Sequence, residues 1–306
     1  MTRPFSDDDL DSAAALLAER HARHREAEPL LPADVDFRAE VEALWRRPGA
    51  SGAVSEHGFL IGAPREDPVW GPNVWVELAG HAADDAEAAR DLYALAAQRW
   101  VDEGKTRHYV MVPATDAPLV DAWFRLGFGQ QHALGIREVP EETPWPEGVR
   151  EATEADLEVL MQLDPLLPDH QARSPVFGRG RPQERKEELR QELLEGLASP
   201  HSVDLLAEVD GRVVGGFYVT TVEDSPMHAG LARPPGAAFL AWAGTRPEVR
   251  GSGAGLALTQ AALAWAHPRG HEVMVTDWRV TNLLSSRFWP ARGFRTTFLR
   301  LYRSIP

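Results

Sequence analysis

The chain of 306 residues contains no cysteine, which excludes disulfide bonds, thiolate metal ligands and cysteine nucleophiles. Cysteine-free chains suit a reducing compartment, so a cytoplasmic location is the simplest expectation. The first residues also lack the basic stretch and apolar core of a secretory signal. The longest apolar-leaning run, residues 254–266, contains Thr259 and Gln260 and is much shorter than the roughly 20 residues that cross a bilayer. No contact with a membrane is therefore expected.

Basic residues are scarce, since 32 Lys and Arg stand against 46 Asp and Glu, for a formal net charge of -14. Binding to nucleic acid requires clustered Lys and Arg against the phosphates, so no nucleic-acid partner is expected. The negative field favours a cationic substrate. The alternative is that the acidic surface serves solubility alone.

Histidine pairs occur at His21 and His24 and at His267 and His271. A proline and a glycine between the second pair disrupt the helical spacing that would place both rings on one face. Because no cysteine adds further ligands, the sequence predicts no metal site.

Length and composition indicate a globular protein of about two domains, with 43% hydrophobic residues. Hydrophobic periodicity predicts the elements of the first half. A helix at residues 86–101, for example, places Leu92, Tyr93 and Trp100 on one face. The expected order is helices at 7–24 and 35–45, strands at 51–55, 58–61 and 74–78, the helix at 86–101, a strand at 108–112 and a short helix ending at Leu126.

Residues 139–148 contain three prolines and no periodicity, which is typical of a semi-rigid linker. Beyond them, Thr153 and Asp156 form a variant of the capping box that starts a helix. An Asp-Gly pair between two β-type runs is a strong hairpin signal. The further elements expected here are a charged helix at 181–197 and strands at 203–209 and 212–221.

The most informative stretch is residues 250–255, Arg-Gly-Ser-Gly-Ala-Gly, between a strand-like run at 237–242 and a helix-like run at 256–263. Glycines remove the Cβ atoms that would block a ligand, and the N–H groups of a helix's first turn have no partners within the helix. An anion there accepts from several N–H groups at the positive end of the dipole. Arg250 adds a planar cation suited to phosphate oxygens. The stretch predicts a phosphate site, against the alternative of a glycine-rich turn without a ligand.

The spacing Arg-x-x-Gly-x-Gly in this stretch resembles the acetyl-CoA pyrophosphate loop of the GCN5-related N-acetyltransferase (GNAT) family. A second stretch, residues 276–294, resembles the second signature of the family. In it a strand is followed by Asn282, Ser285 and the pair Phe288-Trp289, and a Gly-Phe pair closes the stretch. With two motifs in the family's order, the chain is identified as a member of the GNAT family.

The first half repeats the order of elements and ends on a Gly-Phe pair at 127–128, as the second half does at 293–294. This repetition indicates an internal duplication. The resemblance implies an α/β (α+β) class with two tandem GNAT folds, each a mixed, mainly antiparallel sheet flanked by helices. The domains are expected at 1–140 and 149–306, with a proline-rich linker at 141–148. Counting back from the Gly-Phe pairs aligns Val112 with Trp278, Asp116 with Asn282 and Trp123 with Trp289.

The two copies differ at the phosphate loop, where the first copy has Asp84, Asp85 and Glu87 in place of Arg and glycines. Negative side chains at a helix start repel a pyrophosphate. The first half is therefore expected to have lost cofactor binding and to serve as a scaffold or a wall of the acceptor pocket.

The resemblance implies that acetyl-CoA, as cosubstrate, lies between two strands that splay apart. Its pantetheine amides would pair with a strand edge and its pyrophosphate with the helix start. Side chains at the next helix start would donate to its arm, and a ring there would cover it, unless that ring is a plain core aromatic. The residues expected to bind it are Ala243, Gly244, Thr245, Arg250, Gly251, Ser252, Gly253, Ala254, Gly255, Asn282, Ser285 and Phe288.

Acetyl transfer to an amine requires a general base and a proton donor for the departing thiolate. Family members often place a catalytic Glu on the strand that here spans 237–245, where this chain has no acid. Asp277 on the following strand is the candidate base, with a solvent-facing carboxylate as the alternative. The position of the family's frequent Tyr acid holds Trp289, whose N–H is far too weak an acid, so Tyr218 or solvent would donate. Weaker candidates in the loop after the hairpin are Glu223, Asp224 and His228.

The sequence thus predicts an acetyl-CoA-dependent N-acetyltransferase whose second half transfers an acetyl group to a primary amine of a small molecule or peptide. The alternative is a catalytically silent acyl-CoA-binding sensor or interaction protein, which the missing Glu and Tyr favour.

Overall fold

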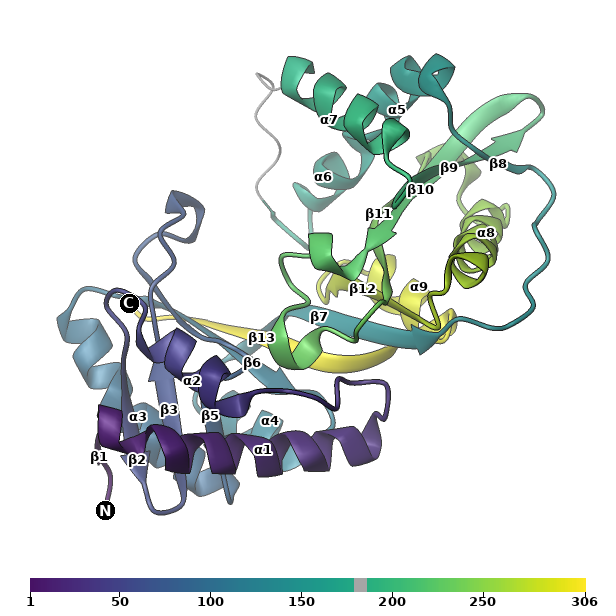
Figure 1. Cartoon of the computed structure of the whole chain (residues 1–306). Helices are drawn as coiled ribbons and strands as arrows, with labels where there is room; N and C mark the ends of the chain where they lie inside the picture. Colours follow the sequence, from purple (N-terminus) through teal and green to yellow (C-terminus); the bar gives the residue numbers. More distant parts are fainter. Residues whose placement is uncertain (179–185) are drawn as a thin grey trace. The chain divides into compact units, whose positions relative to one another are not determined.

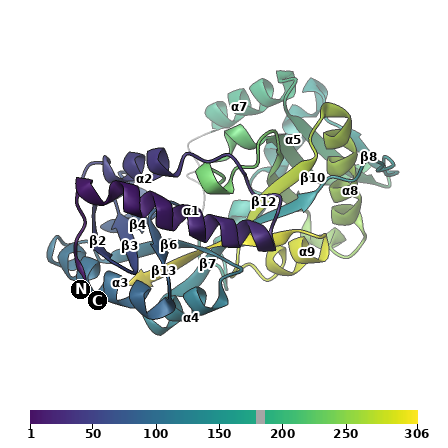
Figure 2. The same ribbon diagram turned by 60° about the horizontal axis from the view of Figure 1, so that its bottom comes forward.

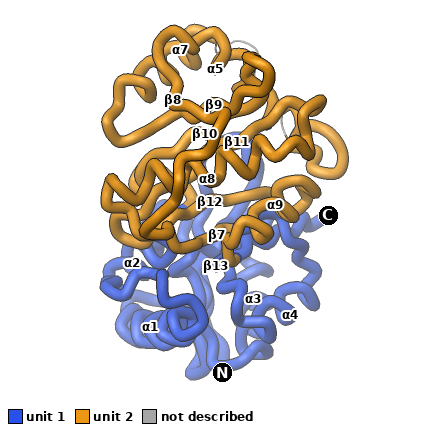
Figure 3. The backbone as a smooth tube through the Cα atoms, turned by 90° about the vertical axis from the view of Figure 1, so that its right-hand side faces the viewer, with its two compact units in different colours: residues 1–133, 228–233, 296–306 blue, residues 134–227, 234–295 orange. Residues whose placement is uncertain are grey.

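The computed structural model describes residues 1–178 and 186–306, which form two compact units (Figure 3). Unit 1 comprises residues 1–133, 228–233 and 296–306, and unit 2 comprises residues 134–227 and 234–295. Of the charged helix predicted at 181–197, residues 181–185 lie outside the described residues, and α7 spans Lys186–Ala198.

Unit 1 contains a four-stranded antiparallel sheet in the order β1-β2-β3-β5 and a second group of strands in the order β4-β6-β13. Helix α1 lies across one face of the strands and α3 across the other (Figures 1 and 2). The elements predicted for this half are confirmed, and the expected face of α3 is buried. Strand β5 was not predicted, because three residues are too few to show a period. The elements are β1 (Arg3–Pro4), α1 (Leu10–Ala27), α2 (Phe37–Trp45), β2 (Ser51–Ser55), β3 (Gly58–Gly62), β4 (Asn73–Val76), β5 (His81–Ala83), α3 (Ala86–Asp102), β6 (Arg107–Pro113), α4 (Ala117–Arg125) and β7 (Gly129–Glu138).

Unit 2 contains strands in the order β7-β12-β11-β10-β9-β8. Helices α5 and α7 lie on one side of β9, β10 and β11, and α8 lies on the other (Figure 1). The predicted hairpin is confirmed, with Asp210 and Gly211 both at positive φ in the turn between β9 and β10. The elements of the second half of the sequence are β8 (Val149–Glu151), α5 (Leu157–Leu163), α6 (Leu166–Gln171), α7, β9 (Val203–Val209), β10 (Arg212–Thr221), β11 (Ala238–Thr245), α8 (Ala254–Ala266), β12 (Val273–Arg279), α9 (Ser285–Ala291) and β13 (Arg295–Ser304), most of which lies in unit 1.

Strands β7 and β13 each continue from one unit into the other. Residues 134–138 of β7 lie in unit 2, where β7 neighbours β12, and residues 296–304 of β13 lie in unit 1, where β13 pairs antiparallel with β6. Each unit therefore includes a strand from the other half of the sequence. The compact units do not coincide with the segments 1–140 and 149–306, and the sequence boundaries of the duplication, with the linker at 141–148, stay a prediction.

Each half of the chain begins with the same polar motif, Arg-x-x-Ser/Thr-x-x-Asp. The hydroxyl and the backbone N–H of the central residue both donate to the carboxylate of the Asp, and the Arg forms an ion pair with it. The predicted capping box is confirmed, and the guanidinium beside each Asp holds the pKa of that carboxyl below its usual range. The repetition supports the duplication. The motif consists of Arg3, Ser6 and Asp9 in unit 1 and of Arg150, Thr153 and Asp156 in unit 2.

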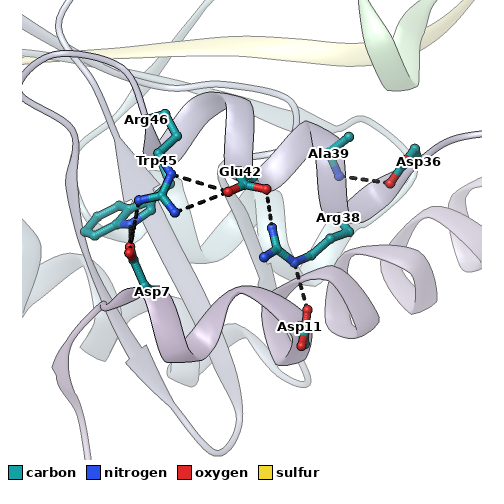
Figure 4. Close-up of polar contacts among 8 residues, drawn as sticks. All are labelled: Asp7, Asp11, Asp36, Arg38, Ala39, Glu42, Trp45 and Arg46. Carbon is teal, nitrogen blue, oxygen red and sulfur yellow. Dashed lines mark hydrogen bonds and ion pairs between the residues drawn. The ribbon is translucent and has the colours of Figure 1, made fainter.

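Ion pairs join α1 to α2 on their exposed sides (Figure 4). Arg46 donates to Asp7 at 3.0 Å, and Arg38 donates to Asp11 at 2.7 Å. Glu42 accepts from both arginines. Exposed pairs of this kind contribute little to stability, so the packing of these helices depends mainly on their buried apolar faces.

Candidate functional site

Strands β11 and β12 separate in unit 2. They pair in parallel from Ala238–Met274 to Leu240–Thr276, and no further pairing of the two is found among the described residues, although β11 continues to Thr245. Where they part, the Thr276 hydroxyl donates to the Leu240 carbonyl at 2.9 Å. The other edge of β11 stays paired with β10 as far as Thr245. The second half of β11 therefore presents one unpaired edge, which can pair with an extended chain.

A β-bulge lies at the point of separation. Tyr218 of β10 pairs with Trp242 and Val219 pairs with Leu240, so Ala241 has no opposite residue. A bulge bends its strand and increases the local twist, which explains why β11 leaves β12 here. The predicted partners of the pantetheine amides lie directly after it, at Ala243, Gly244 and Thr245.

The start of α8 is open. Gly253 precedes the helix with φ +95° and Gly251 has φ +88°, a backbone region that only glycine adopts without strain. A Cβ atom added at either glycine would have no neighbour within 4 Å. Glycine has no side chain to cap the helix. The N–H of Ala254 donates to the Ser252 hydroxyl at 3.4 Å, and the N–H groups of Gly255 and Leu256 remain available to an anion.

Gly255 serves packing. A Cβ at this position would lie 3.2 Å from the Phe288 ring, tighter than most such contacts. The small residue therefore allows the ring of Phe288, on α9, to rest against the first turn of α8. The sequence motif predicted Gly255 as part of the phosphate-binding stretch 250–255. The contact with Phe288 is a further reason for a glycine that the motif did not reveal.

Two arginines supply positive charge to the site. The Arg250 side chain is exposed and makes no hydrogen bond or ion pair with any described residue. Arg292, at the end of α9, places its guanidinium 5.4 Å from the centre of the Phe288 ring. Its buried Nε also has no partner among residues 1–178 and 186–306. Arg292 was not predicted, because no motif distinguishes it from other surface arginines.

One cavity of about 510 Å³ joins these parts. It is lined by the unpaired part of β11, the start of α8, the end of β12 and α9, with α6 on its border. Of the predicted cofactor residues, Ser252 does not line it. Those that do are Ala243, Gly244, Thr245, Arg250, Gly251, Gly253, Ala254, Gly255, Asn282, Ser285 and Phe288.

Asn282 is buried and lies in the turn just before α9. Its Oδ1 accepts from the backbone N–H of Leu284 at 3.1 Å and lies 3.2 Å from Nε2 of His170. Asp116, aligned with it by the duplication, is the N-cap of α4 and accepts from the N–H of Leu119 at 3.0 Å. His170, on α6, also lines the cavity and was missed, because α6 is too short and too polar for a helical period.

Asp277, the predicted general base, lies half-buried on β12 and lines the cavity. Trp289 also lines it, but its ring is buried against Phe288 and Phe294, with centres 4.9 and 5.4 Å away. Tyr218 lines a different cavity. The weaker candidates Glu223, Asp224 and His228 do not line this cavity, and the Asp224 carboxylate accepts from the Thr220 hydroxyl at 2.5 Å.

No group of three or more His, Cys, Asp or Glu side chains that could hold a metal ion is found in the described part of the chain. Burial and the nearby Arg20 lower the pKa of His24 to about 3, so this histidine is neutral in the folded protein at ordinary pH. Of the helices within residues 1–178 and 186–306, none is long and apolar enough to cross a membrane.

Residues 169–294 match the model of the acetyltransferase (GNAT) family. No curated protein matched the sequence. Among solved structures, a GCN5-related N-acetyltransferase from Sphaerobacter thermophilus is similar, with a TM-score of 0.58 and 15% identity over 99% of this chain and 95% of that chain. A tandem GNAT protein from the clavulanic acid biosynthesis pathway is similar with a TM-score of 0.50 and 13% identity, over 99% of this chain and 98% of that chain.

Both structures match nearly the whole chain. Because the identities are low, the similarity shows that the fold is shared and does not extend to activity or substrate. The predicted fold class, with a mixed and mainly antiparallel sheet flanked by helices in each half, is confirmed. The family model covers both the loop at 250–255 and the signature at 276–294 on which the sequence resemblance rested. Residues 169–294 therefore belong to the acetyltransferase (GNAT) family, in a chain with a tandem GNAT fold.

Proposed function

We propose that unit 2 is an acetyl-CoA-dependent N-acetyltransferase that moves the acetyl group to a primary amine of a small molecule or peptide. The observation that carries the proposal is that one cavity runs from the unpaired edge of β11 to the glycine-capped start of α8. Acetyl-CoA has an extended arm with amides followed by a pyrophosphate. A strand edge and then a helix start suit these two parts in the same order.

The residues of the chain divide into three roles toward acetyl-CoA. The backbone of residues 243–245 pairs with the pantetheine amides, and Arg250 with the N–H groups beside Gly253 binds the pyrophosphate. Phe288 covers the arm from the side of α9. When bound, acetyl-CoA supplies a thioester that a neutral amine attacks. Unit 1 serves as a scaffold without a cofactor site of its own.

Asp277 is the proposed general base. It lies on β12 one residue beyond Thr276, the last residue paired with β11, where the two strands begin to diverge. A carboxylate there takes the proton that the amine nitrogen must lose before it reacts. The proton for the departing thiolate comes from solvent, because Trp289 is buried in an aromatic cluster and Tyr218 lines a different cavity.

A second candidate function, a catalytically silent acyl-CoA sensor, is favoured by the packing of Trp289. In that function the cavity binds the cofactor, and no amine is acetylated. Both candidates require acetyl-CoA binding, so only turnover separates them.

The test is calorimetric titration with acetyl-CoA, followed by an assay of CoA release with a panel of primary amines. Because the chain has no cysteine, a thiol reagent reports CoA alone. We expect one acetyl-CoA per chain and amine-dependent release of CoA. The Asp277→Asn variant should keep its affinity for acetyl-CoA and lose about 100-fold in kcat.

Binding without turnover for every amine would favour the sensor. Absence of acetyl-CoA binding by the wild type would rule out both functions. Asp91→Asn, an exposed change on α3 in unit 1, is the matched control and should leave both measurements unchanged.

A further inference from the structure

Three adjacent strands of unit 2 bring a carboxyl and two aromatic rings into one row. The register places Asp204 on β9 opposite Tyr218 on β10, and Tyr218 opposite Trp242 on β11. Residues directly opposite in a sheet carry their side chains on the same face. All three line a cavity of about 260 Å³ on the side where α5 and α7 pack.

Asp204 is buried without a partner for one of its oxygens. It is 7% exposed, and its Oδ2 has no hydrogen-bond partner among the described residues. The neighbours of this position on β9 are apolar and buried, so an acid here lowers stability. Burial raises the pKa of Asp204 to about 7. A carboxyl kept in a cavity at such a cost indicates a ligand that neutralises it.

The rest of the lining suits an organic cation. Leu160 and Leu163 of α5 and Leu193 of α7 form apolar walls, and the rings of Tyr218 and Trp242 offer faces that attract positive charge. Among the described residues, no Lys, Arg or His lines the cavity. Two further carboxyls, on Asp164 and Glu192, add negative potential, although each has an interaction of its own.

We propose that this cavity recognises the cationic part of the acceptor, a small organic ammonium ion with an apolar body. Its charge pairs with Asp204, and its body lies against Tyr218, Trp242 and the leucines of α5 and α7. The proposal rests on the proposed function and narrows its substrate class from primary amines in general to primary amines that also carry a second, cationic group on an apolar body.

Trp242 connects the two sites, because it lines both the smaller cavity and the larger one at β11 and α8. Its buried Nε1 has no partner among the described residues, which leaves a donor for a bound molecule. The nitrogen that is acetylated is a different group from the cation held at Asp204, and it loses its proton at Asp277 in the larger cavity. Asp204 therefore acts on recognition, and its loss should raise KM much more than it lowers kcat.

The experiment is calorimetric titration at pH 8 with 2-phenylethylamine, hexylamine and benzyltrimethylammonium, beside the neutral 2-phenylethanol and hexanol. We expect the cations to bind the wild type at least about tenfold more tightly than the neutral compounds. Asp204→Asn should remove that preference and leave acetyl-CoA binding unchanged. Asp210→Asn, the same change at an exposed turn of the same hairpin, should bind like the wild type.

The Asp204→Asn protein should also unfold at a temperature no lower than the wild type, since a buried unpaired acid has been removed. Asp204→Leu provides a second variant with the same expected loss of preference. Failure of all three cations to bind the wild type, or equal binding of cations by the wild type and both variants, would overturn the proposal. If acetyl-CoA binding and amine-dependent release of CoA persist in that case, the proposed function stands without this cation site. If the cations bind and acetyl-CoA does not, the cavity is a cation site and the proposed function fails.

Discussion

The starts of α3 and α8 occupy equivalent positions in the two copies of the fold and differ in what fills them. In unit 1 the carboxylate of Asp85 accepts from the N–H of Ala88 at 2.8 Å, so the protein satisfies its own helix start. In unit 2 the same position is Gly253, which has no side chain to offer. A negative cap excludes a pyrophosphate that a bare, positive helix end attracts.

The strands that precede these helices also differ, because the one in unit 1 is fully paired and the one in unit 2 is not. All four residues of β4 pair with β6, whereas only the first three of the eight residues of β11 pair with β12. Beyond β4 the buried guanidinium of Arg20 donates to the Leu78 carbonyl at 2.6 Å and to the His81 carbonyl. One fold thus has an open helix start and an unpaired strand edge in one copy, whereas side chains of the protein occupy these places in the other copy. The proposed function therefore depends on a few positions.

The strongest test of this comparison is to give unit 2 the acid of unit 1. Gly253→Asp forces a residue with a Cβ to adopt positive φ and adds a negative charge at the helix start. We expect calorimetry to show acetyl-CoA affinity reduced by at least about 100-fold. The control is Gly104→Asp, at an exposed glycine with φ +78° and no neighbour near its Cβ. Equal loss of affinity in both variants would show that strain, and not the site, is responsible.

Removing the cation of the loop should have a smaller effect. Arg250→Ala should weaken acetyl-CoA binding by about tenfold, because one charge-assisted contact to phosphate is lost while the helix N–H groups remain. Its melting temperature should not change, since the Arg250 side chain is exposed and makes no hydrogen bond or ion pair with any described residue. Arg23→Ala, an exposed change on α1, should bind like the wild type. If Arg250→Ala bound acetyl-CoA as tightly as the wild type, the pyrophosphate would not bind at Arg250.

Opening the start of α3 should cost stability without creating a site. Asp85→Ala removes the N-cap of α3 and should lower the free energy of unfolding by about 1 kcal/mol in urea titrations. The stoichiometry of acetyl-CoA should stay at one per chain, because β4 remains fully paired and Arg20 still occupies the carbonyls beyond it. A second equivalent of bound acetyl-CoA would show that the cap alone closes unit 1.

Substitutions in the two capping boxes should have nearly the same effect on stability in both halves. Asp9→Asn and Asp156→Asn should each lower the free energy of unfolding by about 1 kcal/mol at pH 7. Each carboxyl has a pKa below its ordinary value, so its stabilisation is present above about pH 4 and is lost as the pH falls below that. Urea titrations at pH 7 and pH 3.5 should therefore show each variant approaching the wild type at the lower pH. If the difference in the free energy of unfolding between wild type and variant were the same at pH 3.5 as at pH 7, the ionised carboxylate would not be the stabilising form.

Much of the fold was predictable because its signals are local. The apolar face of α3, the Asp-Gly hairpin and the glycines of the α8 start each follow from neighbouring residues. The exchange of β7 and β13 was not predictable. Both strands follow a Gly-Phe pair, and nothing local decides which sheet each one completes.

The part of the candidate site that could be predicted is the part whose residues are neighbours in the sequence. Arg250 and its glycines form a motif, whereas His170 and Arg292 reach the cavity through packing of α6 and α9. Asp204 did leave a signal, an acid within the apolar run of β9. Its meaning depends on α5 and α7 covering that face, which the sequence of β9 does not contain.

The placement of β13 in unit 1 also bears on how the protein is made. Residues 107–113 leave the ribosome long before residues 298–304, their partners in the sheet. During that interval the edge of β6 is open to wrong pairing, a hazard for slow-folding chains with distant contacts. Unit 1 can therefore complete its folding only after unit 2 has been synthesised. A ribosome that stalls before residue 296 would leave a nascent chain with an open strand edge that can aggregate.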